Sequence, residues 1–147
     1  MEQESTSDLL KVLRSADKDD IDQLQKEYLE TAYSGFPEYM DRLIQEKKLK
    51  RQDIFQKADL PQKYGYKLLS GESHTSDRDK LLRIFIAMNL DLKQTQRALE
   101  LYGMPELYPK FRRDMILIIA FNKGISSVDT VDEWLKEKGE ETLSRSL

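Results

Sequence analysis

Basic, amide and hydroxyl side chains gather in one stretch of the chain, KRQDIFQKADLPQKYGYKLLSGE, residues 50–72. Lys and Arg donate hydrogen bonds and carry positive charge, Gln offers a donor and an acceptor, and Tyr adds a ring with a hydroxyl. A cluster of four basic side chains overlaps the start of this stretch, at Lys47, Lys48, Lys50 and Arg51. Such residue types bind polar or anionic groups, but they do not place a nucleophile beside a general base.

The sequence offers little material for covalent or metal chemistry. It has no Cys, and its one His, His74, stands in the polar loop GESHTS without an obvious partner. The acidic pairs Asp19-Asp20 and Glu140-Glu141 stand at expected helix ends, and no phosphate-cradling Gly-rich loop appears. We therefore expect no enzyme activity, no cofactor and no bound metal.

Charge is distributed unevenly along the 147 residues, whose total is −3. Residues 1–35 hold 4 basic and 9 acidic side chains, residues 36–103 hold 13 and 10, and residues 104–147 hold 7 and 8. A chain of this length makes one domain, or a small domain with helical extensions. We expect an acidic N-terminal helical extension over 1–35, a positively charged central domain over 36–103, and a C-terminal helical pair over 104–147 packed on it.

No apolar run approaches the roughly 20 residues that a membrane span needs. The longest run, Met115 to Phe121, is expected to form the buried core of a helix. The start of the chain, MEQESTSDLL, has neither the basic nor the apolar region of a signal peptide. Together with the lack of Cys, these features indicate a cytoplasmic protein without membrane contact.

Hydrophobic periodicity predicts helices with short connections along the whole chain, and no strand or internal repeat. Ser7 and Ser127 are expected to cap the first and last helices, and Pro37 and Pro61 stand near helix starts. The predicted fold class is all-α, a compact orthogonal helical bundle. The expected helices cover about 8–16, 20–33, 36–49, 51–58, 61–70, 77–89, 92–102, 105–121 and 128–138.

Residues 50–72 are interrupted in the middle by Asp59 and Pro61 and end near Gly71. Asp tolerates the left-handed backbone of a turn, and Pro is tolerated at the start of a helix because its missing N–H costs little there. Gly fits a helix C-terminus. The stretch therefore predicts two short helices joined by a tight turn, a helix-turn-helix pattern.

At these residues the sequence resembles the Cro/Xre family of phage-repressor-like proteins, over about residues 36–103. The spacing matches the family's lambda-repressor-like helix-turn-helix without a gap, and RDKLLRIFIAMNL looks like its fourth helix. The matching apolar and glycine positions are Ile54, Ala58, Leu60, Leu68 and Gly71. The helices expected before residue 36 and after residue 103 are extra N- and C-terminal helices that flank this domain.

The sequence departs from the family pattern at Phe55, Asp59, Pro61 and Gly65. Phe55 stands where the family usually has a small Ala, and Gly65 replaces an apolar anchor of the second helix. We hypothesise that Phe55 fills the volume that Gly65 leaves. Pro61 occupies the position where Ser or Thr usually caps the second helix and touches a phosphate.

The resemblance implies a DNA-binding transcriptional regulator whose helix 61–70 enters the major groove of double-stranded DNA. Gln pairs with adenine, and Lys donates to guanine O6 or N7. The side chains expected to contact bases are Gln62, Lys63, Tyr66 and Lys67. Those expected to contact phosphates are Lys48, Lys50, Arg51 and Ser70.

An alternative function stays open, a non-enzymatic protein-interaction adaptor whose degenerate helix-turn-helix no longer binds DNA. Glu72, Asp77 and Asp79 are expected near the DNA backbone, where their charge opposes binding, and the acidic residues 1–35 could dock on a basic partner. A homodimer or a protein partner is expected to bind through residues 1–35 or 104–147.

Arg112, Arg113 and Asp114 stand together at the start of the apolar run 115–121. We expect them to form a structural ion pair at the edge of the bundle. A ligand or partner site at the same place is the alternative.

Overall fold

The structure is a computed structural model that describes residues 6–24 and 35–144. The backbone contacts divide the chain after Gly35 into two compact units, residues 1–35 and residues 36–147. The described residues form helices and turns without any strand, so the predicted all-α class is confirmed. None of these helices combines the length and apolar character that crossing a bilayer requires.

The first unit begins with α1 (Thr6–Ser15), which starts one residue before Ser7, the expected cap. A short turn follows, in which the carboxylate of Asp17 accepts the backbone N–H of Lys18 and the carboxylate of Asp20 accepts that of Asp17. Of the helix predicted over 20–33, residues 25–34 lie outside the described residues. The described elements are α1 (Thr6–Ser15), the 3-10 turn η1 (Lys18–Asp20) and α2 (Ile21–Leu24).

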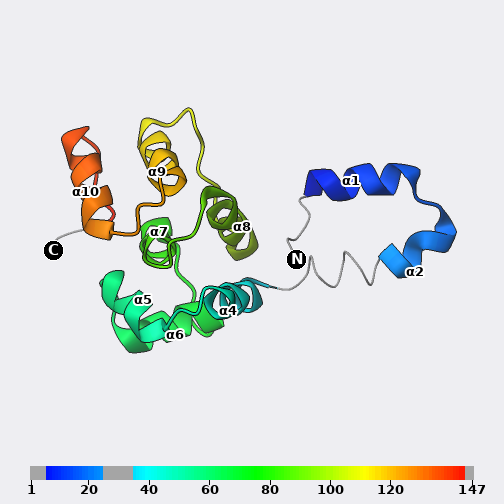
Figure 1. Cartoon of the computed structure of the whole chain (residues 1–147), viewed down its shortest axis with the longest axis horizontal. Helices are drawn as coiled ribbons and strands as arrows, with labels where there is room; N and C mark the ends of the chain where they lie inside the picture. The colour runs from blue at the N-terminus through cyan, green and yellow to red at the C-terminus, as the bar shows by residue number, and fades with distance from the viewer. Residues whose placement is uncertain (1–5, 25–34, 145–147) are drawn as a thin grey trace. The chain divides into compact units, whose positions relative to one another are not determined.

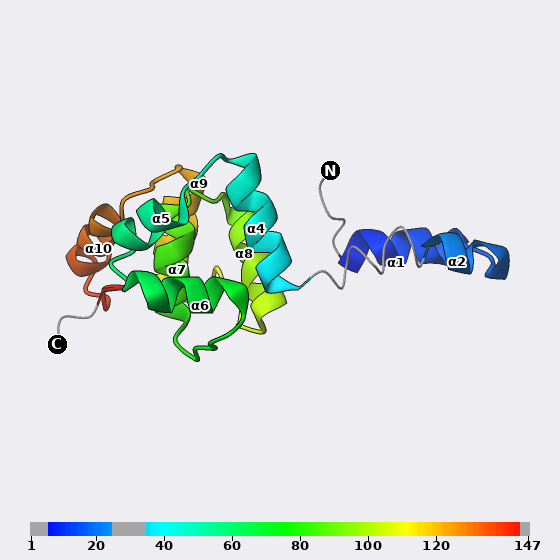
Figure 2. The same cartoon turned by 90° about the horizontal axis from the view of Figure 1, so that it is seen from below.

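In the second unit, helix α7 lies at the centre, with α9 on one side of it and α5 and α6 on the other (Figure 1). Helices α4 and α8 pack side by side (Figure 2). The described helices of this unit are α4 (Phe36–Glu46), α5 (Arg51–Lys57), α6 (Gln62–Ser70), α7 (Arg78–Ala87), α8 (Leu92–Tyr102), α9 (Arg112–Asn122) and α10 (Val128–Glu137).

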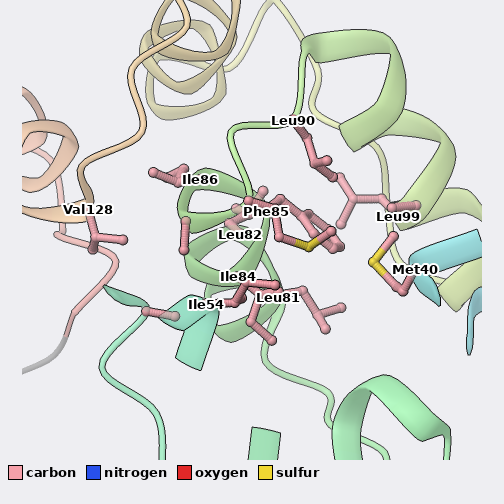
Figure 3. Packing of buried hydrophobic residues seen from close by; sticks show 14 of the residues in the cluster. Met40, Ile54, Leu81, Leu82, Ile84, Phe85, Ile86, Leu90, Leu99 and Val128 are labelled. Atoms are coloured by element: carbon pink, nitrogen blue, oxygen red, sulfur yellow. The ribbon is translucent and has the colours of Figure 1, made fainter. Parts of the chain in front are cut away.

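Helix α7 is central because it is apolar on nearly every face, which is typical of a helix buried on all sides. Figure 3 shows its buried side chains together with partner residues on neighbouring helices of the same cluster. Those partners are Met40 of α4, Ile54 of α5, Leu99 of α8 and Val128 of α10. Apolar residues of α9 and α10 belong to the same cluster, so one core extends through residues 36–144.

The segment between α8 and α9 corrects one prediction, since the helix expected from Pro105 begins only at Arg112. Pro109 lacks an N–H and disfavours helical backbone at the residue before it, which ends any helix at this point. Instead, Gln96 of α8 holds the segment, with its Oε1 accepting the N–H of Leu107 at 2.8 Å and its Nε2 donating to the Leu107 carbonyl at 2.9 Å.

Left-handed turn residues set several helix ends. Asp59 has φ 56° and Gly71 has φ 83°, as expected for the turn before α6 and for its C-terminus. Lys48 (φ 55°) and Asn89 (φ 56°) also turn the chain, so α4 and α7 end earlier than predicted. The cap predicted at Ser127 is confirmed, because its hydroxyl accepts the N–H of Thr130 at the start of α10.

Candidate functional site

Helices α5 and α6 are joined by the tight turn of residues 58–61. The N–H of Ala58 donates to the carbonyl of Ile54, and that of Leu60 donates to the carbonyl of Phe55, both at 2.9 Å. Leu60 is buried and ties the turn to the core. Pro61, in extended conformation, precedes the first turn of α6 without supplying a side-chain cap. The local sequence therefore forms a helix, a turn and a second helix, as predicted.

The two helices touch through Phe55 and Gly65. The Phe55 ring is completely buried, and a Cβ atom at position 65 would lie 2.5 Å from its Cγ. The hypothesis that Phe55 occupies the volume left by Gly65 is therefore confirmed. The ring of Tyr66 meets Phe55 edge-on, with centroids 5.2 Å apart, so Phe55 also supports an aromatic side chain on the outside of α6.

The outward face of α6 carries Lys63, Tyr66 and Ser70, all exposed, beside a half-buried Lys67. The opposite face, with Gly65 and two leucines, is buried in the core. The helix contains no Asp or Glu, so its side chains give it a charge of +2 from its two lysines. Three of the four residues predicted to contact bases are thus brought together on one face.

Gln62, the fourth predicted base contact, is engaged within the protein. Its Nε2 donates to the backbone carbonyl of Gln52 in α5 at 2.8 Å. Its Oε1 is buried and has no hydrogen-bond partner among the described residues. Gln62 therefore ties the start of α6 to α5. The sequence could not indicate this role, because the acceptor is a main-chain group whose position depends on the fold.

The residues predicted to contact phosphates have different surroundings. Lys48 and Lys50 are exposed in the turn before α5. Arg51, by contrast, donates from Nη2 to Oδ1 of Asp41 in α4 at 2.8 Å. Ser70 is exposed, and its hydroxyl donates to the carbonyl of Lys67 at 3.2 Å. The partner of Arg51 was missed because Asp41 lies ten positions away on another helix.

Two of the three acidic residues expected near the DNA backbone have structural roles. Asp77 caps α7, since its carboxylate accepts the N–H of Asp79 at 3.0 Å. Asp79 is itself buried and accepts two hydrogen bonds from Arg113, at 2.9 and 3.0 Å. Only Glu72 is exposed, so the expected repulsion from these acids is smaller than the sequence suggested.

Two crossed ion pairs join the starts of α7 and α9. Arg113 of α9 binds Asp79 of α7, and Arg78 of α7 binds the buried Asp114 of α9, with Nη2 and Oδ1 2.6 Å apart. Burial alone lowers the pKa of Arg113, but the hydrogen bonds and charge of Asp79 outweigh it and raise this pKa above its ordinary value. The structural ion pairing expected of residues 112–114 is therefore confirmed, and the partners lie on α7.

A sequence signal for these pairs exists, because the dipeptide Arg-Asp begins two apolar helices, at residues 78–79 and 113–114. Three of these side chains, Arg78, Asp79 and Arg113, line a shallow polar hollow together with Ser76 and Asp77. Since the arginines there already bind carboxylates, the hollow presents a neutral, self-paired surface. It supports the packing of α9 on α7.

His74 has an aromatic partner, contrary to expectation. Its ring stacks on that of Tyr102, with centroids 4.5 Å apart and an interplanar angle of 13°. The hydroxyl oxygen of Tyr102 also accepts the N–H of the buried Thr75 at 2.7 Å. Burial raises the pKa of this hydroxyl above its ordinary value. The loop after α6 is thereby held against α8.

Residues 6–24 and 35–144 contain no group of three His, Asp or Glu side chains placed to hold a metal ion. The fold and the site define a class of protein, an all-α bundle that carries a short basic helix, α6, on its surface. No protein-family model matches the chain, and no curated protein or solved structure matches it either.

Proposed function

We propose that this protein is a DNA-binding transcriptional regulator that places α6 in the major groove of double-stranded DNA. The observation that supports the proposal best is the outward face of α6, where Lys63, Tyr66 and Lys67 gather on a helix without acidic residues. A cytoplasmic location goes with this function.

In the proposed complex, the N-terminal half of α6 contacts base edges, as the second helix of such a pair does in known complexes. Lys63 and Lys67 donate to guanine O6 or N7. Tyr66, supported by Phe55, contributes a ring surface. Gln62 reaches a base only after its hydrogen bond to the Gln52 carbonyl is exchanged, so in this complex it mainly holds α6 in place.

Phosphate contacts come from side chains just before α5, at its first residue, and at the last residue of α6. Lys48 and Lys50 are exposed and bind phosphates directly, whereas Ser70 donates to a phosphate only after its hydroxyl leaves the Lys67 carbonyl. Arg51 contacts a phosphate while its guanidinium remains bound to Asp41, and this ion pair fixes the orientation of the guanidinium. Regulators of this kind usually bind as dimers to half-sites about 34 Å apart. A homodimer contact through residues 1–35 or 104–147 belongs to this proposal.

The test is binding of the full chain to a random duplex pool at increasing salt, starting at about 50 mM. Each phosphate contact contributes roughly 0.9 to the log–log salt slope, so Lys50→Ala should reduce the slope by about that amount. Lys63→Ala should change the selected sequence. Lys136→Ala, on the exposed face of α10, is the matched control and should change neither. Lack of binding to any duplex at the lowest salt would overturn the proposal.

The adaptor function is the second candidate, and one observation favours it. Three residues expected to contact DNA already use donors within the protein: Gln62 on Gln52, Arg51 on Asp41, and Ser70 on Lys67. If no duplex binds, a protein-interaction adaptor with a degenerate helix-turn-helix becomes the better explanation. The excess of acidic residues in 1–35 then suggests a basic partner.

A further inference from the structure

Helix α9 exposes an apolar stripe that the sequence predicted to be buried. Met115 and Ile119 are 47% and 42% exposed, and the preceding Phe111 and Tyr108 are 62% and 46% exposed. Residues 111, 115 and 119 are four positions apart, so they form one ridge along the helix. The opposite side of α9, with Leu117, Ala120 and Phe121, is the side that packs on the core.

Exposure of this stripe is costly for a surface with no partner. Apolar side chains gain free energy when they leave water, and contiguous exposed apolar patches usually mark interaction surfaces. The Tyr108 and Phe111 rings contact each other edge-on, with centroids 4.9 Å apart. They therefore form a preorganised aromatic end of the stripe, which lowers the entropic cost of binding.

The charges beside the stripe indicate what covers it. Between Pro109 and Gly124 the exposed charged residues are Lys110, Arg112 and Lys123, all of them basic, and the exposed Glu106 precedes Tyr108. The one acidic residue of this segment, Asp114, is buried against Arg78. Arg112 lies 3.6 Å from Glu140, so the lysines, at the two ends of the stripe, remain the main charges offered to a partner.

The position of α9 argues against a second copy as the occupant. Helix α7 lies between α9 and the α5–α6 pair (Figure 1). Two copies joined through their α9 stripes would leave their α6 helices facing away from each other. Such a dimer does not present two reading helices to adjacent half-sites of one duplex. The stripe and α6 can instead be occupied at the same time by different partners.

We propose that the α9 stripe is the docking surface for an acidic amphipathic helix of a partner protein. The apolar face of that helix covers Phe111, Met115 and Ile119 in the manner of helix–helix packing. Acidic residues near its two ends meet Lys110, in the turn before α9, and Lys123, at the C-terminal end of α9. The preference for a partner protein over a second copy rests on the proposed DNA reading, whereas the contact itself forms without DNA. It would recruit the partner to the side of the bundle away from α6.

The probe is a fluorescein-labelled peptide of about 18 residues with leucines at helical spacing and Glu at both ends. A matched peptide carries Lys in place of each Glu. Fluorescence anisotropy with the full chain at low salt should show about tenfold tighter binding of the Glu peptide. Met115→Gln should abolish binding, and Tyr66→Ser, a change of an exposed ring on α6, should leave it unchanged.

Reversal of charge gives the sharpest outcome. The double variant Lys110→Glu/Lys123→Glu should bind the Lys peptide better than the Glu peptide, while its urea unfolding matches that of the wild type. Binding of neither peptide, or equal binding of both that survives Met115→Gln, would overturn the proposal. A dimer that Met115→Gln converts to a monomer in sedimentation velocity would also overturn it, because a second copy would then cover the stripe.

Discussion

The ring of Phe55 lies directly on the α-carbon side of Gly65, where a Cβ atom would stand 2.5 Å from Cγ and 2.7 Å from Cε1 of the ring. Each residue therefore requires the other. A glycine inside a helix costs about 1 kcal/mol relative to alanine, and here that cost is offset by a buried aromatic ring. The pair sets the distance between α5 and α6 and supports Tyr66 from below.

We expect Gly65→Ala to destabilise the protein by about 1–3 kcal/mol through overpacking, despite its better helix propensity. Phe55→Ala should cost about 3–5 kcal/mol because it leaves a cavity. The double variant Phe55→Ala/Gly65→Ala should lose about 0.5–3 kcal/mol less stability than the sum of the two single variants. The reason is that the new methyl group at position 65 occupies space that the Phe55 ring has vacated. Urea unfolding measures all three, and Ser70→Ala on the same helix controls for propensity. Strict additivity would contradict the contact.

Loss of Arg78 should be far more costly than loss of a surface arginine. Arg78→Met removes the guanidinium from Asp114, which is 3% exposed, and should lower the free energy of unfolding by about 3–5 kcal/mol. Arg42→Met, which removes an exposed pair with Glu46, should cost at most about 0.5 kcal/mol. Adding Asp114→Leu to Arg78→Met should recover part of the loss. Equal effects of the two arginine variants would show that the crossed pairs are not stabilising.

Tyr102→Phe removes the acceptor of the Thr75 N–H but keeps the ring on which His74 stacks. Because that N–H belongs to a buried residue, we expect a loss of about 1–3 kcal/mol. Hydrogen exchange at the Thr75 amide should become faster, whereas Tyr108→Phe, at an exposed ring, should change neither quantity. Unchanged exchange at Thr75 would mean that another group accepts this hydrogen.

Gln62 and Lys63 are adjacent, yet their substitution should have different consequences. Gln62→Ala breaks the hydrogen bond to Gln52 and should lower stability by about 1 kcal/mol. Lys63→Ala, at an exposed site, should change stability by no more than about 0.5 kcal/mol. If DNA is bound, sequence selection should change with Lys63→Ala, whereas Gln62→Ala should weaken all sequences alike. A specific loss of adenine preference in Gln62→Ala would assign Gln62 to base contact instead.

The local pattern of the chain was enough to predict most of the helices. Periodic apolar residues and caps are short-range signals, so α4 to α8 and α10 lie near their predicted ranges, and Asp59 and Ser127 have the expected roles. The prediction of a helix that begins at Pro105 is wrong. The apolar periodicity of MILIIAF belongs to α9, which begins only at Arg112, after Pro109. Pro109 restricts the backbone only at itself and at the residue before it, so the sequence alone contains this helix boundary.

The charged and apolar groups of the surface were harder to predict, because their partners lie on other helices. Arg113 binds Asp79 rather than the neighbouring Asp114, and Arg51 binds Asp41, ten residues away. Whether a side chain is buried also depends on residues that are distant in the sequence. The sequence shows that Met115 and Ile119 are apolar, but whether another helix covers them depends on how α7, α8 and α10 fill the space around α9.

The sequence by itself determined that this chain forms short helices, where most of them begin and end, and which side chains are basic. These properties depend on interactions between residues a few positions apart. Only the tertiary structure decided that Gln62 faces α5, that Lys63 and Tyr66 face solvent, and that one ridge of α9 is left uncovered. Packing between helices distant in sequence fixes such exposure, and no periodicity within a single helix contains that information.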